Sequence, residues 1–165
     1  PAGVLLRNGT FIACAVERAT ETSVRASGLL KPVNLTVPNV SRIHFAPIPA
    51  AMEKTIPRGR AGVLLARGDF VDGDFRGFDG QRVRLNSILF GTRSYEIRKE
   101  ALAVVLRDAV TNAASFELRL RDRSMLRVDS LRLENGQWLG RDTIAGPLKL
   151  AAGEVESLRR LARPR

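Results

Sequence analysis

The stretch Gly62-Val63-Leu64-Leu65-Ala66-Arg67-Gly68-Asp69-Phe70 occurs in three related versions along this chain and decides its architecture. An earlier version reads Gly3-Val4-Leu5-Leu6-Arg7-Asn8-Gly9-Thr10-Phe11, and a more divergent one reads Glu117-Leu118-Arg119-Leu120-Arg121-Asp122-Arg123-Ser124-Met125. A pattern that recurs along a chain indicates one supersecondary unit that has been repeated. The sequence therefore predicts three copies of a single small unit within 165 residues.

Each copy combines short apolar stretches with tight turns, which is typical of antiparallel strands. In the middle copy an apolar strand is expected at Gly62–Leu65, followed by a turn at Ala66–Asp69. The next stretch, Phe70–Phe78, alternates apolar and polar residues, as a half-buried strand does. Gly73 and Gly77 within it indicate a bulge or a bend. Strongly bent strands allow a short sheet to close into a small barrel.

The remaining strands of the middle copy are expected in the same order as in the other two. They are predicted at Gln81–Ser87, Ser94–Arg98 and Leu102–Leu106, and a loop is expected at Ile88–Arg93. The end of the third copy leaves an alternative open, because the leucines at 158 and 161 are three residues apart, a spacing that also fits a helical turn.

We expect an all-β fold of three tandem five-stranded small barrels that pack together, because so small a unit buries little surface alone. The expected barrel repeats span residues 1–47, 62–108 and 116–165, and the last carries a basic C-terminal tail. The expected linkers are residues 48–61 and 109–115. A β-trefoil, which is also built from three repeats, is the alternative architecture.

The chain carries a net charge of +10, which favours anionic partners such as nucleic acid or acidic glycan. The excess is spread evenly, however, with +3, +3 and +4 over residues 1–57, 58–112 and 113–165. An arginine-rich composition without a binding role is therefore the competing interpretation. No apolar run approaches the roughly 18 residues that a membrane-spanning helix needs.

No catalytic, metal-binding or cofactor-binding set is recognisable, and we expect neither an enzyme nor a cofactor. Cys14 and His44 are each the only residue of their kind. A single cysteine excludes an intramolecular disulfide and a CxxC motif. A single histidine cannot build a Ser-His-Asp triad or a site with several histidine ligands.

The candidate binding residues are arginines and aromatics. Candidate anion-binding residues are Arg119, Arg121, Arg123, Arg159 and Arg160. Acidic residues are interleaved with the first three of them, so cross-strand pairing is the competing interpretation. Candidate residues for stacking against bases or sugars are Tyr95 and Trp138.

The order of strands and turns resembles the Sm-like and SH3-like small β-barrels. It is closest to a divergent repeat found in exported and envelope proteins of bacteria, including planctomycete-type proteins. In the Sm family an Asp and an Asn in one turn hold an RNA base, and an Arg-Gly step precedes the last strand. The middle copy keeps Asp79 and Arg98, but Arg82 stands in place of the Asn and Lys99 in place of the Gly. No copy keeps the whole RNA-binding pocket.

The resemblance implies a non-enzymatic structural or interaction protein, an envelope or extracellular component with protein partners or self-assembly. Pro1 is not a methionine, so we expect that an upstream segment has been removed, and an export signal with it. An exported location is favoured over a cytoplasmic one. The alternative function is an arginine-driven binding module for an anionic polymer.

Overall fold

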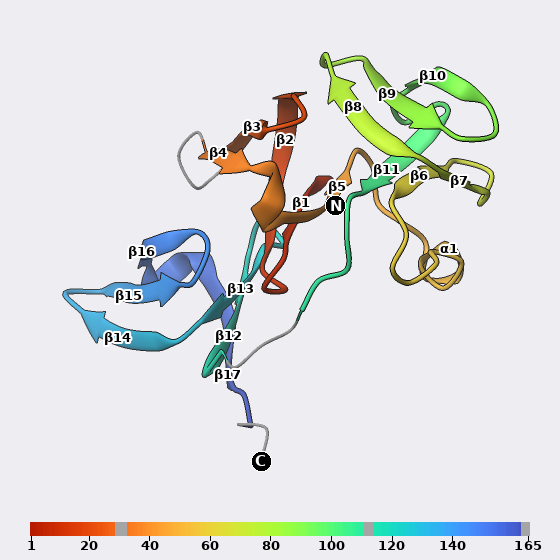
Figure 1. Ribbon diagram of the computed structural model, residues 1–165. Helices are drawn as coiled ribbons and strands as arrows, with labels where there is room; N and C mark the ends of the chain where they lie inside the picture. The colour runs from red at the N-terminus through yellow and green to blue at the C-terminus, as the bar shows by residue number, and fades with distance from the viewer. Residues whose placement is uncertain (29–32, 111–113, 163–165) are drawn as a thin grey trace.

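The computed structural model describes residues 1–28, 33–110 and 114–162 and shows an all-β protein (Figure 1). We call β1–β5 the first unit, β6–β11 the second unit and β12–β17 the third unit. The strands of the first unit are β1 (Gly3–Leu6), β2 (Phe11–Ala19), β3 (Ser23–Gly28), β4 (Val33–Thr36) and β5 (Val40–His44), with a 3₁₀ turn (Val37–Asn39) before β5.

The helix α1 (Ala50–Glu53) precedes the second unit. The strands of the second unit are β6 (Gly62–Leu65), β7 (Phe70–Asp72), β8 (Asp74–Phe78), β9 (Arg82–Ser87), β10 (Gly91–Glu96) and β11 (Ala101–Val105). Those of the third unit are β12 (Phe116–Leu120), β13 (Met125–Val128), β14 (Ser130–Glu134), β15 (Gln137–Asp142), β16 (Gly146–Ala151) and β17 (Val155–Arg160), with a 3₁₀ turn (Ala152–Glu154) before β17.

The same antiparallel pairing scheme recurs in the three units. In each, the first strand lies between the second and the last: β1 pairs with β2 and β5, β6 with β7 and β11, and β12 with β13 and β17. The long second strand runs unbroken as β2 but is split by Gly73 into β7 and β8, as the glycine pattern predicts. A Cβ on Gly73 would lie 2.6 Å from the carbonyl oxygen of Asn86, so the close approach there requires glycine.

The first two units share one sheet and one hydrophobic core. Their last strands, β5 and β11, pair antiparallel, so that the sheet continues from one unit into the other. Fully buried residues of both units, among them Val4, Ile43, Val63 and Val104, belong to the same core cluster. A second, smaller cluster on the outer side of β6 and β11 is covered by side chains of the segment around α1, including Met52.

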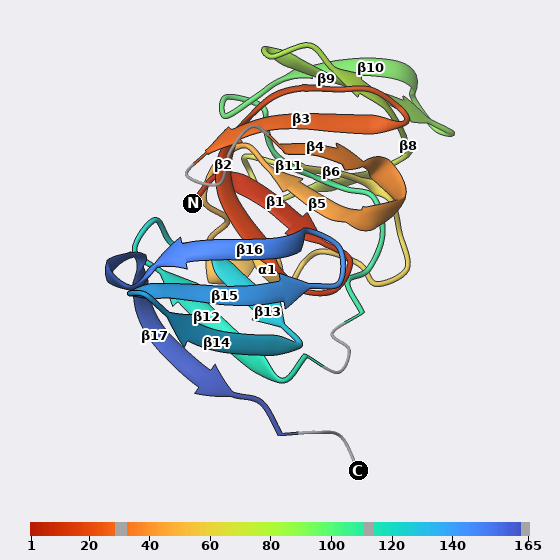
Figure 2. The same cartoon turned by 90° about the vertical axis from the view of Figure 1, so that its left-hand side faces the viewer.

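The third unit has a core of its own. Leu118, Leu120 and Leu126 are its fully buried centre, and Trp138 packs against it. Strands β14, β15 and β16 form a separate three-stranded sheet that lies beside β12 and β13 (Figure 2). A single backbone pairing, between Met125 of β13 and Phe11 of β2, connects the third unit to the first.

The all-β expectation is confirmed, and two local expectations are corrected. The helical alternative near the C-terminus is limited to the 3₁₀ turn Ala152–Glu154, because residues Val155–Arg160 pair with β12 as a strand. The strand expected from Ser94 begins at Gly91, because β10 pairs with β9 along its whole length and leaves a short hairpin turn. The finer description as three separate barrels with the stated boundaries stays a prediction, and so does the trefoil alternative. None of the helices among the described residues is long and apolar enough to cross a membrane.

The turn after the first strand has the same geometry in every unit. Its backbone hydrogen bonds are Leu6 N to Thr10 O (2.7 Å), Leu65 N to Asp69 O (2.8 Å) and Leu120 N to Ser124 O (2.9 Å). The fourth residue of each turn has a positive φ, 91° at Gly9, 99° at Gly68 and 74° at Arg123. The third unit therefore places an arginine where the conformation favours glycine.

Replacing Arg123 by glycine should stabilise the protein. The left-handed conformation is disfavoured for a residue with a Cβ, so Arg123→Gly should raise the free energy of unfolding by about 1 kcal/mol. Urea denaturation measures this change. The matched variant Gly68→Arg should lower the free energy of unfolding, and a destabilised Arg123→Gly protein would contradict the prediction.

Candidate functional site

Two of the five candidate anion-binding arginines lie together around a buried carboxylate. Glu117 is 3% exposed, and Arg159 is its partner across β12 and β17. Its carboxylate lies 3.3 Å from a guanidinium nitrogen of Arg159 and 3.5 Å from Arg119 and Arg127. One negative charge faces three positive ones, so this side of the third unit keeps a local positive excess.

The other three candidate arginines point elsewhere. The Nε of Arg121 donates to the carbonyl oxygen of Gly153 at 2.7 Å, which ties the turn after β12 to the turn before β17. Arg123 occupies the tip of the first of these turns. Arg160 pairs with Phe116 across the strands, on the opposite face from Glu117. The structure thus brings together Arg119 and Arg159 but not the five residues, and anion binding stays a prediction.

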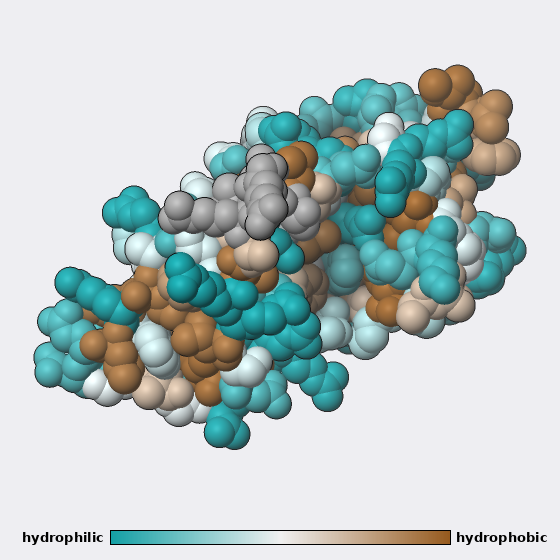
Figure 3. Space-filling model, turned by 90° about the horizontal axis from the view of Figure 1, so that it is seen from below, coloured by the Kyte–Doolittle hydropathy of each residue, from teal (hydrophilic) through white to brown (hydrophobic). Residues whose placement is uncertain are grey.

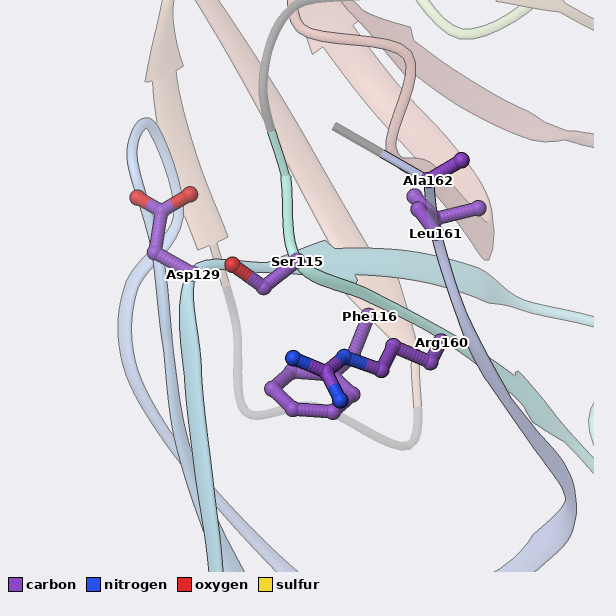
Figure 4. A pocket seen from close by; sticks show the side chains of 6 residues that line it. All are labelled: Ser115, Phe116, Asp129, Arg160, Leu161 and Ala162. Atoms are coloured by element: carbon purple, nitrogen blue, oxygen red, sulfur yellow. The ribbon is translucent and has the colours of Figure 1, made fainter. Parts of the chain in front are cut away.

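Arg160 and Phe116 line a cavity of about 530 Å³ at the C-terminal end of β17. Figure 4 shows their side chains directed to the same side, with Ser115 above them and Asp129 further away in this view. This hollow adjoins the outer edge of β17, which has no neighbouring strand on that side among the described residues.

The two candidate stacking residues are half-buried and belong to different cores. Tyr95 packs against the core of the first two units, and Trp138 packs against that of the third. Their rings therefore do not form one joint platform, and a stacking role for either stays a prediction.

The most buried polar contact between units is made by the hairpin tip that joins β15 and β16. Asp142, 1% exposed, accepts hydrogen bonds from the Nδ2 of Asn8 (2.7 Å) and the hydroxyl of Thr10. It also accepts from the backbone N–H groups of Ile144 and Ala145, which shapes its own turn. The side chains of these two residues pack against the core that the first two units share. We call this docking of the tip 142–146 on the turn between β1 and β2 the tip contact.

The Thr10 hydroxyl connects the tip contact to the strands. It accepts a hydrogen bond from the backbone N–H of Arg127 at 2.9 Å while it donates to Asp142. Nearby, the hydroxyl of Ser124 accepts from the backbone N–H of Ala13 at 2.9 Å. The first and third units are thus held to each other by specific hydrogen bonds as well as by apolar packing.

The second unit has an equivalent tip whose large apolar side chains are exposed in the described part of the chain. The turns Ser87–Gly91 and Asp142–Gly146 have the same length, and their final glycines have positive φ values of 67° and 80°. Ile88, Leu89 and Phe90 are 101%, 83% and 56% exposed. In Figure 3 a cluster of hydrophobic side chains protrudes at the end of the molecule where the β9–β10 hairpin lies in Figure 1.

A groove of about 600 Å³ runs beside this exposed tip. Phe70 and Val71 of β7 form part of its wall, and Asp72 and Asp74 add negative charge in a chain that is otherwise basic. Sequence reasoning treated Ile88–Phe90 only as part of a loop and missed its exposure. The available signal was three consecutive large apolar residues in a turn, where polar residues are usual.

Burial shifts the pKa values of both Cys14 and His44 away from neutrality. Burial raises the pKa of the Cys14 thiol to about 11, against the lowering effect of a hydrogen bond from the backbone of Val4. Burial also lowers the pKa of His44 to about 4, so the imidazole is neutral at physiological pH. Among the residues described here, no three His, Cys, Asp or Glu side chains gather as a metal site would require.

Comparison with known proteins adds no relative. No protein-family model matches the chain, and neither the curated proteins nor the solved structures contain a significant match to it.

Removing the Asp142 carboxylate should destabilise the protein. Asp142→Ala leaves the buried hydroxyl of Thr10 without its acceptor and removes one of the two acceptors of the Asn8 amide, so we expect the free energy of unfolding to fall by about 2–3 kcal/mol. Urea denaturation measures the loss. The control Asp129→Ala removes an exposed carboxylate of the same unit and should change stability by less than about 0.5 kcal/mol. Equal effects of the two variants would contradict the role of the tip contact.

Proposed function

We propose that this protein is a non-enzymatic structural protein that assembles through its β units, with a second copy of the chain as the partner. The observation that carries the proposal is a duplication of contacts. The units are held together by two kinds of contact, a paired strand edge and a docked hairpin tip. In the described part of the chain, one further strand edge is unpaired and one further hairpin tip is exposed.

The first kind of contact is strand pairing at an edge, made between β5 and β11. The equivalent strand of the third unit, β17, pairs with β12 alone. An exposed strand edge presents unpaired N–H and C=O groups, which bind readily to another strand.

The second kind is the tip contact. The β15–β16 tip docks on the first unit, whereas the equivalent β9–β10 tip, Ile88–Phe90, is exposed. The docked tip carries Ile144 into apolar packing, which supports the same use of the more apolar Ile88–Phe90 tip against a β unit of a second copy.

Two different open contacts on one chain favour growth beyond a dimer. An edge can pair with its own copy, whereas a tip that docks on a different surface makes a head-to-tail contact, which propagates unless it closes into a ring. The recurring pairing scheme also supports a relationship of the units to the Sm-like and SH3-like barrels, in a chain specialised for assembly.

Purified protein should self-associate. Sedimentation velocity from low to high micromolar concentration should show a sedimentation coefficient that rises with concentration, because both contacts would form between copies. A single sharp monomer peak over the whole range would overturn the proposal.

The Ile88→Ser/Leu89→Ser/Phe90→Ser variant should reduce the largest assemblies while leaving thermal stability nearly unchanged, because these side chains are exposed. The matched control is Leu133→Ser, which removes an exposed leucine of β14, away from the tip. A triple variant that sediments like the wild type would exclude the tip as a contact. Binding of the wild type, but not the variant, to neutral lipid vesicles would assign the tip to a membrane surface instead.

Binding to an anionic polymer is the second candidate, supported by the positive excess around Glu117. Arg119 is 62% exposed at its side chain and available to a sulfate or phosphate group. Wild-type protein should then elute from immobilised heparin only at raised salt, and Arg119→Gln should elute earlier than the control Arg67→Gln. Equal elution of the two variants would exclude this surface.

A further inference from the structure

The last strands of the three units have a common register. Each last strand pairs with the first strand of its unit, and the equivalent pairs are Ile43 with Val4, Val104 with Val63 and Leu158 with Leu118. A register shift occurs at the same place in each unit, near the start of the last strand. Residues 43, 104 and 158 are therefore structurally equivalent.

The pairing of β5 with β11 is symmetric about these equivalent residues. Ile43 lies opposite Val104, and the flanking pairs His44–Ala103 and Arg42–Val105 mirror each other. The hydrogen bonds beyond them are also mirrored.

These bonds are Phe45 N to Leu102 O and Leu106 N to Ser41 O, both 2.8 Å long. The chain thus contains a local two-fold pairing of two equivalent strands.

The third strand of this kind lacks that partner. Ile43 and Val104 are completely buried, because each has a strand on both sides. Leu158 is 42% exposed, because β17 has a neighbour only on the β12 side. Leu158 is the equivalent of the two central residues of the β5–β11 pair, and its large apolar side chain is left partly in water.

We propose that β17 pairs antiparallel with β17 of a second copy of this chain, with Leu158 opposite Leu158 of the partner subunit on the two-fold axis. This inference rests on the proposed function and identifies the register and the partner of one of its contacts. The β5–β11 pair is the template, and applying its symmetry to β17 fixes which residues face each other.

The residues that this register brings together are complementary. Glu156 lies opposite Arg160 of the partner subunit, and the two-fold axis repeats this pair of opposite charges. Neither side chain takes part in an ion pair among the described residues. Ser157 faces Arg159 of the partner subunit, which avoids a contact between like charges. Opposite charges at directly paired positions stabilise a sheet, and like charges destabilise it.

The cavity beside Arg160 is consistent with the same arrangement. It is lined by Leu161 and Ala162 at the end of the β17 edge. In the proposed register, Val155 of the partner subunit lies opposite Leu161, so the start of the partner's strand covers this hollow. One strand pair buries less surface than a standard stable interface, so the dimer should form in the micromolar range or above.

Charge reversal tests the register. In Glu156→Arg, two arginines face each other on both sides of the axis, and the dissociation constant of the dimer should rise at least about tenfold. Glu156→Arg/Arg160→Glu restores opposite charges and should restore the wild-type constant. Sedimentation equilibrium, in the Ile88→Ser/Leu89→Ser/Phe90→Ser background to remove the tip, measures all three. A double variant as weak as the single one would overturn the proposed pairing.

Cysteine cross-linking tests it independently. In a Cys14→Ser background, Leu158→Cys should form a disulfide-linked dimer under mild oxidation, because antiparallel partners lie about 5 Å apart. The control Glu156→Cys should not link to itself, since four residues of offset separate the two copies by about 13 Å. Self-association without the Leu158→Cys cross-link would overturn the β17 pairing but leave the proposed function standing. A wild-type chain that remains monomeric would overturn both.

Discussion

Backbone pairing along the outer side of each unit's last strand is the constraint on which this structure depends. The first strand of a unit covers one edge of the last strand, and the unit has no strand left to cover the other. A buried backbone needs hydrogen-bond partners on both edges. The first two units satisfy this need for each other through β5 and β11, and in doing so they merge their sheets and cores. The third unit is then left with an edge of its own.

Much of the fold could be predicted from local sequence. Strands are indicated by stretches in which apolar and polar residues alternate, a turn by Asn8–Gly9 and a bend by Gly73. These features depend on neighbouring residues in the sequence, so local sequence is enough to predict them. The pairing of β5 with β11 could not be predicted in this way, because it joins residues about sixty positions apart and depends on which edges remain open. The helical spacing of Leu158 and Leu161 was misleading because pairing with β12 overrides a weak local preference.

The candidate site was less predictable than the fold. Arginine positions are visible in the sequence, but whether they meet depends on strand faces. Of the five candidate arginines only Arg119 and Arg159 lie against Glu117, and Arg127, which was not a candidate, joins them there. Asp142 gave no signal, because its partners Asn8 and Thr10 lie more than 130 residues away and all three residues are common in ordinary turns. The exposed tip could have been recognised, since Ile88–Phe90 is a run of three large apolar residues where the equivalent turn of the third unit has Thr143-Ile144-Ala145.

Glu117 also marks a structural difference between the units. It stands where the other units have Gly3 and Gly62, and a Cβ on those glycines would lie 2.2 and 2.1 Å from backbone carbonyl oxygens of the neighbouring strand. In the third unit, by contrast, Glu117 pairs with Arg127 of β13 in regular antiparallel register, so β12 and β13 leave room there for a side chain. The third unit therefore carries a charged side chain at a position where the close approach of the strands in the other two units requires glycine.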